Sequence, residues 1–161
     1  MLRLDPTAFG ETFEHASQQP DSHWAAWASR AATATDTCSM LAVEAEVRLV
    51  GHIGSIWKDD LTSLGAMWVE PAYRRAGVGG RLLDAILAWA DEAHPTSAVR
   101  LGVFPTQGAA VRLYRERGFV ATGKVLPVEN APGVLYQEML RRPARSSPEG
   151  SPVGQPDRGE T

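Results

Sequence analysis

The sequence has almost no cysteine and no long apolar run. Cys38 is the only cysteine among 161 residues, which excludes a disulfide framework and a thiolate metal site and indicates a reducing, intracellular compartment. Within TCSMLAV we expect this lone thiol to be a small buried hydrophobe. No stretch approaches 18 apolar residues and the N-terminus has no apolar signal region, so neither membrane insertion nor secretion is expected. The sequence therefore predicts a cytoplasmic protein.

An excess of positive charge is also missing. The formal net charge is −3 and acids and bases are interspersed, so the sequence offers no basic stripe for a nucleic-acid partner. His15, His23 and His94 lie in polar contexts without metal-ligand partners at useful spacing. We therefore expect no metal site.

Composition divides the chain into two parts. Residues 142–161 are rich in proline, glycine and serine and contain almost nothing apolar, so burial cannot offset the entropy of ordering them. We expect a disordered tail there. Residues 1–141 show no second linker and no repeat, and they are predicted to form one domain around one core.

Hydrophobic periodicity predicts a mixed α/β domain. Strand-like runs occur at residues 37–43, 47–57, 61–69, 98–104, 119–125 and 134–140. The first two are expected to pair as a hairpin around the turn at residues 44–46. Helical spacing recurs from Leu82 to Ala90 and from Gly108 to a stop at Gly118, and Trp24 and Trp27 suit a short earlier helix. Strands and helices thus alternate, as in an α/β fold.

The stretch RRAGVGGRLL, residues 74–83, joins a strand to a helix through three glycines. Such a turn directs free backbone N–H groups and the positive end of the helix dipole at one point, which suits an anion. A simple tight turn is the alternative. The two common nucleotide motifs do not fit, because Leu82 replaces the third glycine of the dinucleotide fingerprint and Arg81 replaces the P-loop lysine.

What fits is R-x-x-G-x-G, present as Arg74, Gly77 and Gly79, which resembles the acyl-CoA pyrophosphate loop of the GNAT-type N-acetyltransferases. QGAAVRLYRERGF, at Gln107–Phe119, resembles the family's other motif, in the correct order and spacing. The resemblance covers about Val47 to Leu140. It implies a mixed, mostly antiparallel central sheet with splayed parallel strands and flanking helices, and acetyl-CoA as the co-substrate.

The resemblance also implies roles for individual residues. The pyrophosphate would be held by the side chains of Arg74 and Arg75 and by a run of backbone amides, those of Arg75, Ala76, Gly77, Val78, Gly79 and Gly80. Met67 and Val69 would pair through their backbone with the pantetheine arm, and an N–H such as that of Val69 would polarise the thioester carbonyl. Gln107 stands where the family usually has Asn, so its hydrogen bond near the arm is expected to be longer or lost.

Tyr114 would be the general acid, giving its proton to the departing thiolate while a primary amine attacks the acetyl carbon directly. The alternative role for Tyr114 is packing in the core beside Leu113, with its hydroxyl bonded to the backbone. The alternative function is a non-catalytic acyl-CoA-binding sensor or regulatory module, which would keep the loop but not need Tyr114. The amine stays open, from a small metabolite or polyamine to a peptide amine.

The general base is not identified by the pattern. An alkylammonium with a pKa near 10.4 must lose a proton before it attacks, yet the run at residues 61–69 carries no carboxylate. The candidates are Glu70, Glu11, Glu14, His52, Asp59 and Asp60, or a chain of waters. Candidate residues for the acceptor side are Trp24, Trp27, Trp57, Phe9 and Glu11, each equally suited to a core.

The N-terminal region departs from the family pattern. Family members usually open with a strand and a long helix, whereas MLRLDPTAFGETFEHA resembles the loop and second helix that follow, so we expect the first strand to be absent. An uncovered edge would then be left at Thr37–Val43. A homodimer that covers this edge is the resulting hypothesis.

Overall fold

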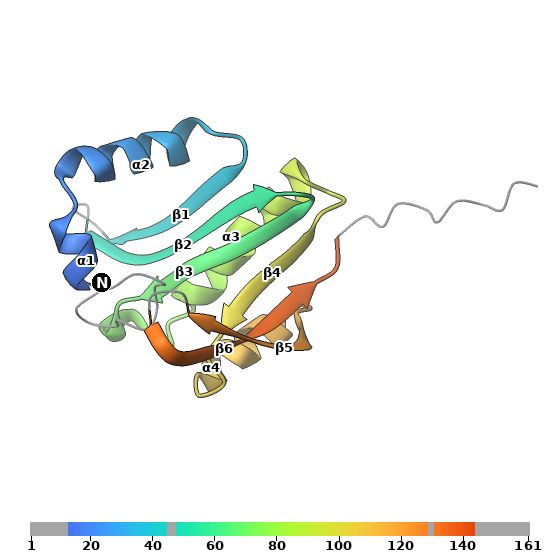
Figure 1. Ribbon diagram of the computed structural model, residues 1–161. Coiled ribbons are helices and arrows are strands. Elements are labelled where there is room, and N and C mark those ends of the chain that lie inside the picture. Colours follow the sequence, from blue (N-terminus) through green and yellow to red (C-terminus); the bar gives the residue numbers. More distant parts are fainter. Residues whose placement is uncertain (1–12, 45–47, 129–130, 144–161) are drawn as a thin grey trace, which may run out of the picture.

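The computed structural model describes residues 13–44, 48–128 and 131–143, and it shows one six-stranded sheet with flanking helices (Figure 1). The strands are β1 (Thr37–Glu44), β2 (Arg48–Lys58), β3 (Leu61–Val69), β4 (Ala98–Val103), β5 (Val120–Val128) and β6 (Ala131–Arg141). The helices are α1 (Phe13–Gln18), α2 (Asp21–Thr33), α3 (Val78–Ala93) and α4 (Gly108–Arg115), with a 3-10 turn at Pro71–Tyr73.

The sheet has the order β1-β2-β3-β4-β6-β5 and is antiparallel except for the central pair β3 and β4. This arrangement confirms the predicted mixed, mostly antiparallel sheet. β1 and β2 pair antiparallel as the expected hairpin, with the turn at residues 45–47 outside the described residues. β3 and β4 pair only from Leu61–Ala98 to Leu64–Leu101, so the two parallel strands separate beyond that point.

Helix α3 supplies the centre of the core. Its apolar stripe, predicted from spacing alone, is buried at Leu82, Leu83, Ile86, Leu87 and Ala90. The helix lies across β1, β2 and β3 on one face of the sheet (Figure 1). Full burial of each large aliphatic side chain contributes about 1.5–3 kcal/mol, so this stripe holds α3, and the loop before it, firmly against the sheet.

Two ion pairs brace α3 against other elements. Arg117, just after α4, donates to both carboxylate oxygens of Asp84, at 2.6 and 3.0 Å, and this holds the pKa of Asp84 below its usual range. Arg141 at the end of β6 makes the same bidentate contact to Asp91, at 2.7 Å for each bond. Both pairs have the planar fork geometry that fixes orientation as well as distance.

Three predictions concern the ends of the chain and the sheet edge. Residues 1–12 lie outside the described residues, so the expected absence of a first strand is untested there. β6 ends at Arg141, and of the predicted tail only Arg142 and Pro143 are described. Among the described strands β1 lies at one edge of the sheet, with Leu41 and Val43 exposed, and the homodimer through this edge stays a prediction.

Candidate active site between the splayed strands

A β-bulge in β3 opens the centre of the sheet. Ala66 and Met67 together oppose the single residue Ile53 of β2, because the register shifts between His52 and Gly54. Ala66 has a φ of 52°, a left-handed conformation that is strained for a residue with a Cβ. The bulge begins where β3 stops pairing with β4, so the strand bends away and leaves its backbone unpaired toward β4.

The gap between the strands forms a small crevice of about 60 Å³. Its lining includes Gly65, Ala66 and Met67 from β3, Leu101, Gly102 and Val103 from β4, and Gln107 and Tyr114. Met67, Gln107 and Tyr114 were all selected from the sequence, and the structure brings them to one place. An extended chain entering this crevice meets exposed strand edges on both sides.

The glycine loop begins at the end of β3 and leads into α3. Gly77 is the N-cap residue with a φ of 80°, and α3 starts at Val78 without a side-chain cap or an acidic residue in its first turn. The N–H groups of the first turn therefore point outward without helical partners, at the positive end of the helix dipole. A Cβ at Gly79 would lie 3.1 Å from Cε of Met67, so glycine lets the helix start close beside β3.

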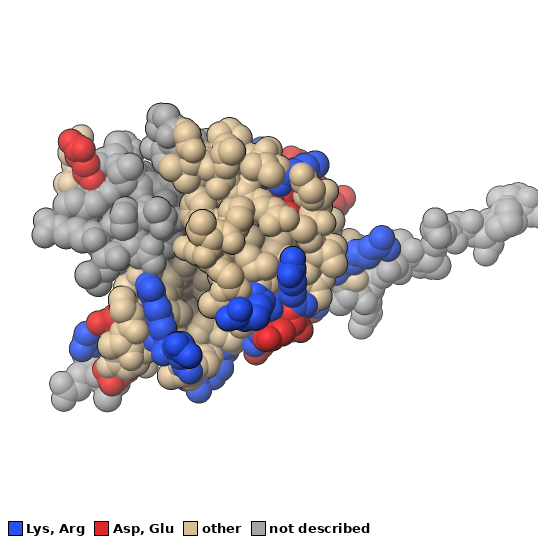
Figure 2. Space-filling view, turned by 90° about the horizontal axis from the view of Figure 1, so that it is seen from below, with Lys and Arg blue, Asp and Glu red and all other residues tan. Residues whose placement is uncertain are grey.

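The two arginines of the loop have different surroundings. Arg74 donates from Nε to the carbonyl oxygen of Val69 at 2.8 Å, which ties the loop to the last residue of β3. Arg75 is exposed and has a φ of 66°. Seen from below, the surface shows Lys and Arg side chains in clusters, with Asp and Glu side chains beside some of them (Figure 2). In the loop itself the two arginines add positive charge, which suits a ligand with phosphates.

Tyr114 lies on α4 beneath the crevice. The side chain is 5% exposed and meets the ring of Phe119 edge to face, with centroids 5.9 Å apart. The ring packs in the core cluster beside Leu113, as the alternative role expects, but no residue in the described part of the chain makes a hydrogen bond to the hydroxyl. Burial raises the pKa of Tyr114 to about 12, and the phenol keeps its proton throughout the neutral range.

This pKa makes stability depend on pH in the alkaline range. The unfolded chain loses the phenol proton near pH 10 and the folded chain only near pH 12, so the contribution of Tyr114 is complete below pH 10 and is lost as pH rises through 12. The free energy of unfolding should fall by roughly 3 kcal/mol from this group over that interval. Urea unfolding of wild type and Tyr114→Phe at each pH tests this, because only wild type should show this part of the decline. Parallel curves would contradict it.

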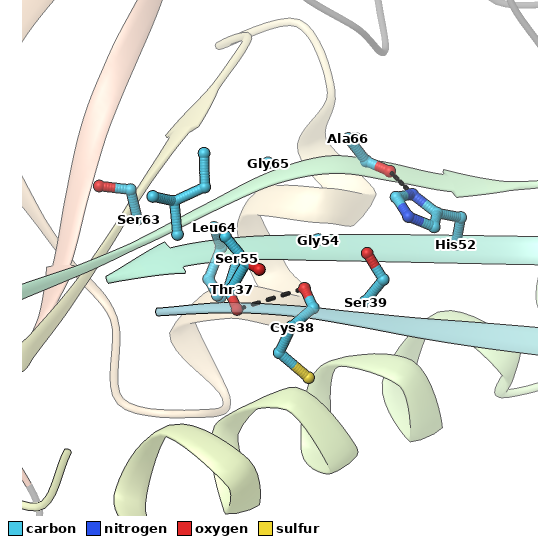
Figure 3. Close-up of a pocket in the computed structure, with 11 residues that line it drawn as sticks. Thr37, Cys38, Ser39, His52, Gly54, Ser55, Ser63, Leu64, Gly65 and Ala66 are labelled. Atoms are coloured by element: carbon cyan, nitrogen blue, oxygen red, sulfur yellow. Dashed lines mark hydrogen bonds between the residues drawn. The ribbon is translucent and has the colours of Figure 1, made fainter. Parts of the chain in front are cut away.

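A larger cavity of about 480 Å³ lies on the face of the sheet opposite α3. Its walls come from β1, β2 and β3 (Figure 3), and the lining residues are Thr37, Cys38, Ser39, His52, Gly54, Ser55, Ile56, Ser63, Leu64, Gly65 and Ala66. Alternation along β2 fixes the face: a Cβ at Gly51 would touch Leu82 of α3, so His52 and Gly54 point the other way. Residues 64–66 line both hollows, so the cavity and the crevice are adjacent.

The structure separates the candidate bases. Glu70 pairs with Arg48, and Asp59 and Asp60 form the exposed turn at the opposite end of β2 from Arg48. Glu14 is exposed on α1, and Glu11 lies outside the described residues. His52 lines the cavity, with Nδ1 3.0 Å from the carbonyl oxygen of Ala66. Among the candidate bases that the structure describes, His52 is the one that lines the 480 Å³ cavity.

The candidate acceptor-side aromatics lie elsewhere or are not described. Trp57 donates from Nε1 to Oγ of Ser97 at 2.8 Å and stacks on His94, with centroids 4.3 Å apart. These contacts lie at the C-terminal end of α3, away from the glycine loop. Trp24 on α2 is exposed, while Phe9 and the Trp27 side chain lie outside what the structure describes.

Two further observations concern ligands and membranes. Within residues 13–44, 48–128 and 131–143, no three His, Cys, Asp or Glu side chains gather as a metal site would require, and the absence of a metal stays a prediction. No helix in the same residues is long and apolar enough to cross a membrane.

Comparison with known proteins identifies the family. The family model "Acetyltransferase (GNAT) family" matches residues 1–119, and the chain belongs to this family. Membership supports acetyl transfer from acyl-CoA as the general activity. No curated protein matches the chain.

Solved structures share the fold at low identity. A GNAT-family acetyltransferase from Streptococcus pneumoniae has a TM-score of 0.66 at 19% identity, covering 78% of each chain. A variant of spermidine N-acetyltransferase from Vibrio cholerae has a TM-score of 0.61 at 17% identity, covering 76% of this chain and 75% of that one. The structure of yncA from Salmonella typhimurium with its cofactor acetyl-CoA has a TM-score of 0.63 at 16% identity, covering 83% and 78%.

Proposed function

We propose that the protein transfers an acetyl group from acetyl-CoA to a primary amine by direct attack, with Tyr114 as the general acid. The observation that carries this proposal is the buried phenol in the crevice between β3 and β4, next to a cavity on the face of the sheet opposite α3. A cofactor arm in the crevice would place its thioester between Tyr114 and that cavity. The two arginines of the glycine loop and the unpaired strand edges of the crevice support acetyl-CoA as the co-substrate.

The chain's own groups would divide the work of binding. The backbone N–H groups from Arg75 to Gly80 hold the pyrophosphate, and the side chains of Arg74 and Arg75 add charge. Arg74 also positions the end of β3 through its bond to the Val69 carbonyl. Met67 and Val69 present their backbone to the pantetheine arm. Gln107, one methylene longer than Asn, contacts the arm from the start of α4.

The buried phenol of Tyr114 suits proton donation to sulfur. A phenol with a pKa of about 12 is a weak acid beside an ordinary thiol, whose pKa is near 8.5. A thiolate that leaves into the same crevice is desolvated as well. Desolvation raises the pKa of the thiol, as it does that of the phenol, and so reduces the difference between the two pKa values. Tyr114 is therefore protonated when the cycle begins and donates a hydrogen bond to the sulfur as negative charge develops there.

The cavity residues favour an acceptor with a largely uncharged body. The described residues lining it include no carboxylate, and most of their side chains are small. A primary amine in the cavity can then lie with its nitrogen toward residues 64–66, where the cavity adjoins the crevice.

The test combines calorimetry and a thiol-release assay. Acetyl-CoA should bind to the protein alone, and free CoA should appear only when a primary amine from a panel is added, together with one equivalent of the amide. Tight binding with no thiol release from any amine would favour the sensor function instead. Thiol release that no amine accelerates would indicate hydrolysis and would also contradict the proposal.

A further inference from the structure

The cavity on the face opposite α3 contains one buried imidazole. His52 is 7% exposed and lies on β2, at the register position beside the bulge in β3. The side chain projects to the face opposite α3, so it lies outside the apolar core cluster around that helix. Burying a polar ring costs free energy unless it is hydrogen-bonded, and an ionisable side chain on a cavity wall is a candidate for a functional role.

One contact fixes the tautomer of His52. Nδ1 lies 3.0 Å from the carbonyl oxygen of Ala66, and a carbonyl oxygen can only accept a hydrogen bond. Nδ1 therefore carries the proton in the neutral ring, and Nε2 is left with its lone pair. The φ of 52° at Ala66 belongs to the same bulge that opens the crevice. Figure 3 shows this bond from the ring to Ala66.

Two glycines leave free space in front of the ring. Gly54 of β2 and Gly65 of β3 are register partners, and neither carries a side chain to fill the cavity floor. A Cβ at Gly54 would lie 3.5 Å from Cε1 of His52, the ring atom bonded to both nitrogens, and a Cβ at Gly65 would meet nothing within 4 Å. The imidazole edge therefore overhangs an open floor that adjoins the crevice.

The surroundings of the ring contain little other charge. Cys38 of β1 is the other titratable side chain among the described residues that line the cavity. Its Sγ points toward α3 and away from His52 (Figure 3), and burial raises its pKa. The register partner of His52 on β1 is Leu41 and that on β3 is Trp68, and neither is ionisable. Within the described cavity wall, His52 is thus the side chain whose ring nitrogen offers a free lone pair.

We propose that Nε2 of His52 is the proton acceptor for the amine substrate, which rests on the proposed acetyl transfer. The substrate ammonium gives one proton to Nε2, and the free amine forms the C–N bond to the acetyl carbon while the C–S bond breaks. The thiolate receives the phenol proton of Tyr114, and the second amine proton restores the phenol. The His52 proton leaves to solvent, so the products are one amide, one thiol and one proton.

The pH dependence of kcat/KM separates this role from a structural one. His52→Asn keeps an N–H that can reach the Ala66 carbonyl but has no basic nitrogen. With an alkylamine, its kcat/KM near pH 7 should be about 100-fold below wild type. The deficit should then shrink about tenfold per pH unit as solvent supplies more free amine, so that it is gone by about pH 9, still below the amine pKa near 10.4. His23→Asn, on the exposed face of α2, is the matched control and should follow wild type.

A second measurement needs no turnover. Nitrogen-15 NMR of the imidazoles in the protein alone should show His52 with its proton on Nδ1. A proton on Nε2, or a His52→Asn deficit that is the same at every pH, would overturn the role of His52 while leaving acetyl transfer intact. If the wild-type protein acetylates no amine, the proposed function and this inference are overturned together.

Discussion

Tyr114→Phe is expected to lower kcat about 10²–10⁴-fold while the dissociation constant of acetyl-CoA stays nearly unchanged. The substitution removes one oxygen from a buried ring and keeps the edge-to-face contact with Phe119, so the crevice should keep its shape. The hydroxyl has no hydrogen bond from the described residues, and its loss leaves no buried partner unsatisfied there. Steady-state kinetics with the best amine of the panel and calorimetry with acetyl-CoA provide the two readouts.

Tyr73→Phe is the matched control for this experiment. The Tyr73 hydroxyl donates to the carboxylate of Glu44 outside the crevice, so its removal should change kcat little. Equal kcat values for wild type and Tyr114→Phe would reject Tyr114 as the acid. A parallel loss of acetyl-CoA affinity would show instead that the ring shapes the binding site.

Reversing both charges of the loop, Arg74→Glu with Arg75→Glu, should raise the dissociation constant of acetyl-CoA at least about 100-fold. A charge-assisted hydrogen bond contributes about 1.5–3 kcal/mol, and two acids placed beside a pyrophosphate add repulsion. The effect should weaken as salt is added, because both side chains lie in the exposed loop. Calorimetry over a salt series measures both the loss and its screening.

The single variants and a distant reversal complete the design. Arg75→Glu changes charge alone, whereas Arg74→Glu also removes the bond to the Val69 carbonyl and should additionally disturb the end of β3. Lys58→Glu makes the same change of charge at the opposite end of β2 from the loop and should leave affinity unchanged. If the double variant binds acetyl-CoA as tightly as wild type, the loop is not the phosphate site.

Local patterns were sufficient to predict much of this fold. The spacing of Leu82, Leu83 and Ile86 predicted the buried face of α3, since a helix repeats every 3.6 residues wherever it packs. The runs of β-branched and apolar residues located all six strands to within about two residues, apart from the edges of β5 and β6. The motif containing Arg74, Gly77 and Gly79 located the start of α3 next to the end of β3.

The geometry around the bulge could not be predicted, because it depends on pairing between distant residues. LTSLGAMWV reads as one strand with a break at Gly65, yet the residue with positive φ is Ala66. The side-by-side position of Gly54 and Gly65 follows only from the register of β2 and β3. For the same reason His52 was one of several candidate bases in the sequence, and the cavity alone distinguishes it from Asp59 or Glu14.

The left-handed backbone at Ala66 joins two parts of the site mechanically. The bulge at Ala66 lies where β3 separates from β4, so it affects the width of the crevice. It also sets the direction of the Ala66 carbonyl, which accepts the hydrogen bond from His52. A change at Ala66 that widens the crevice for a bulkier acyl chain would also change the orientation of the His52 imidazole. If the proposed roles of the crevice and of His52 hold, a variant selected for a change in acyl-chain length should also show a change in proton removal.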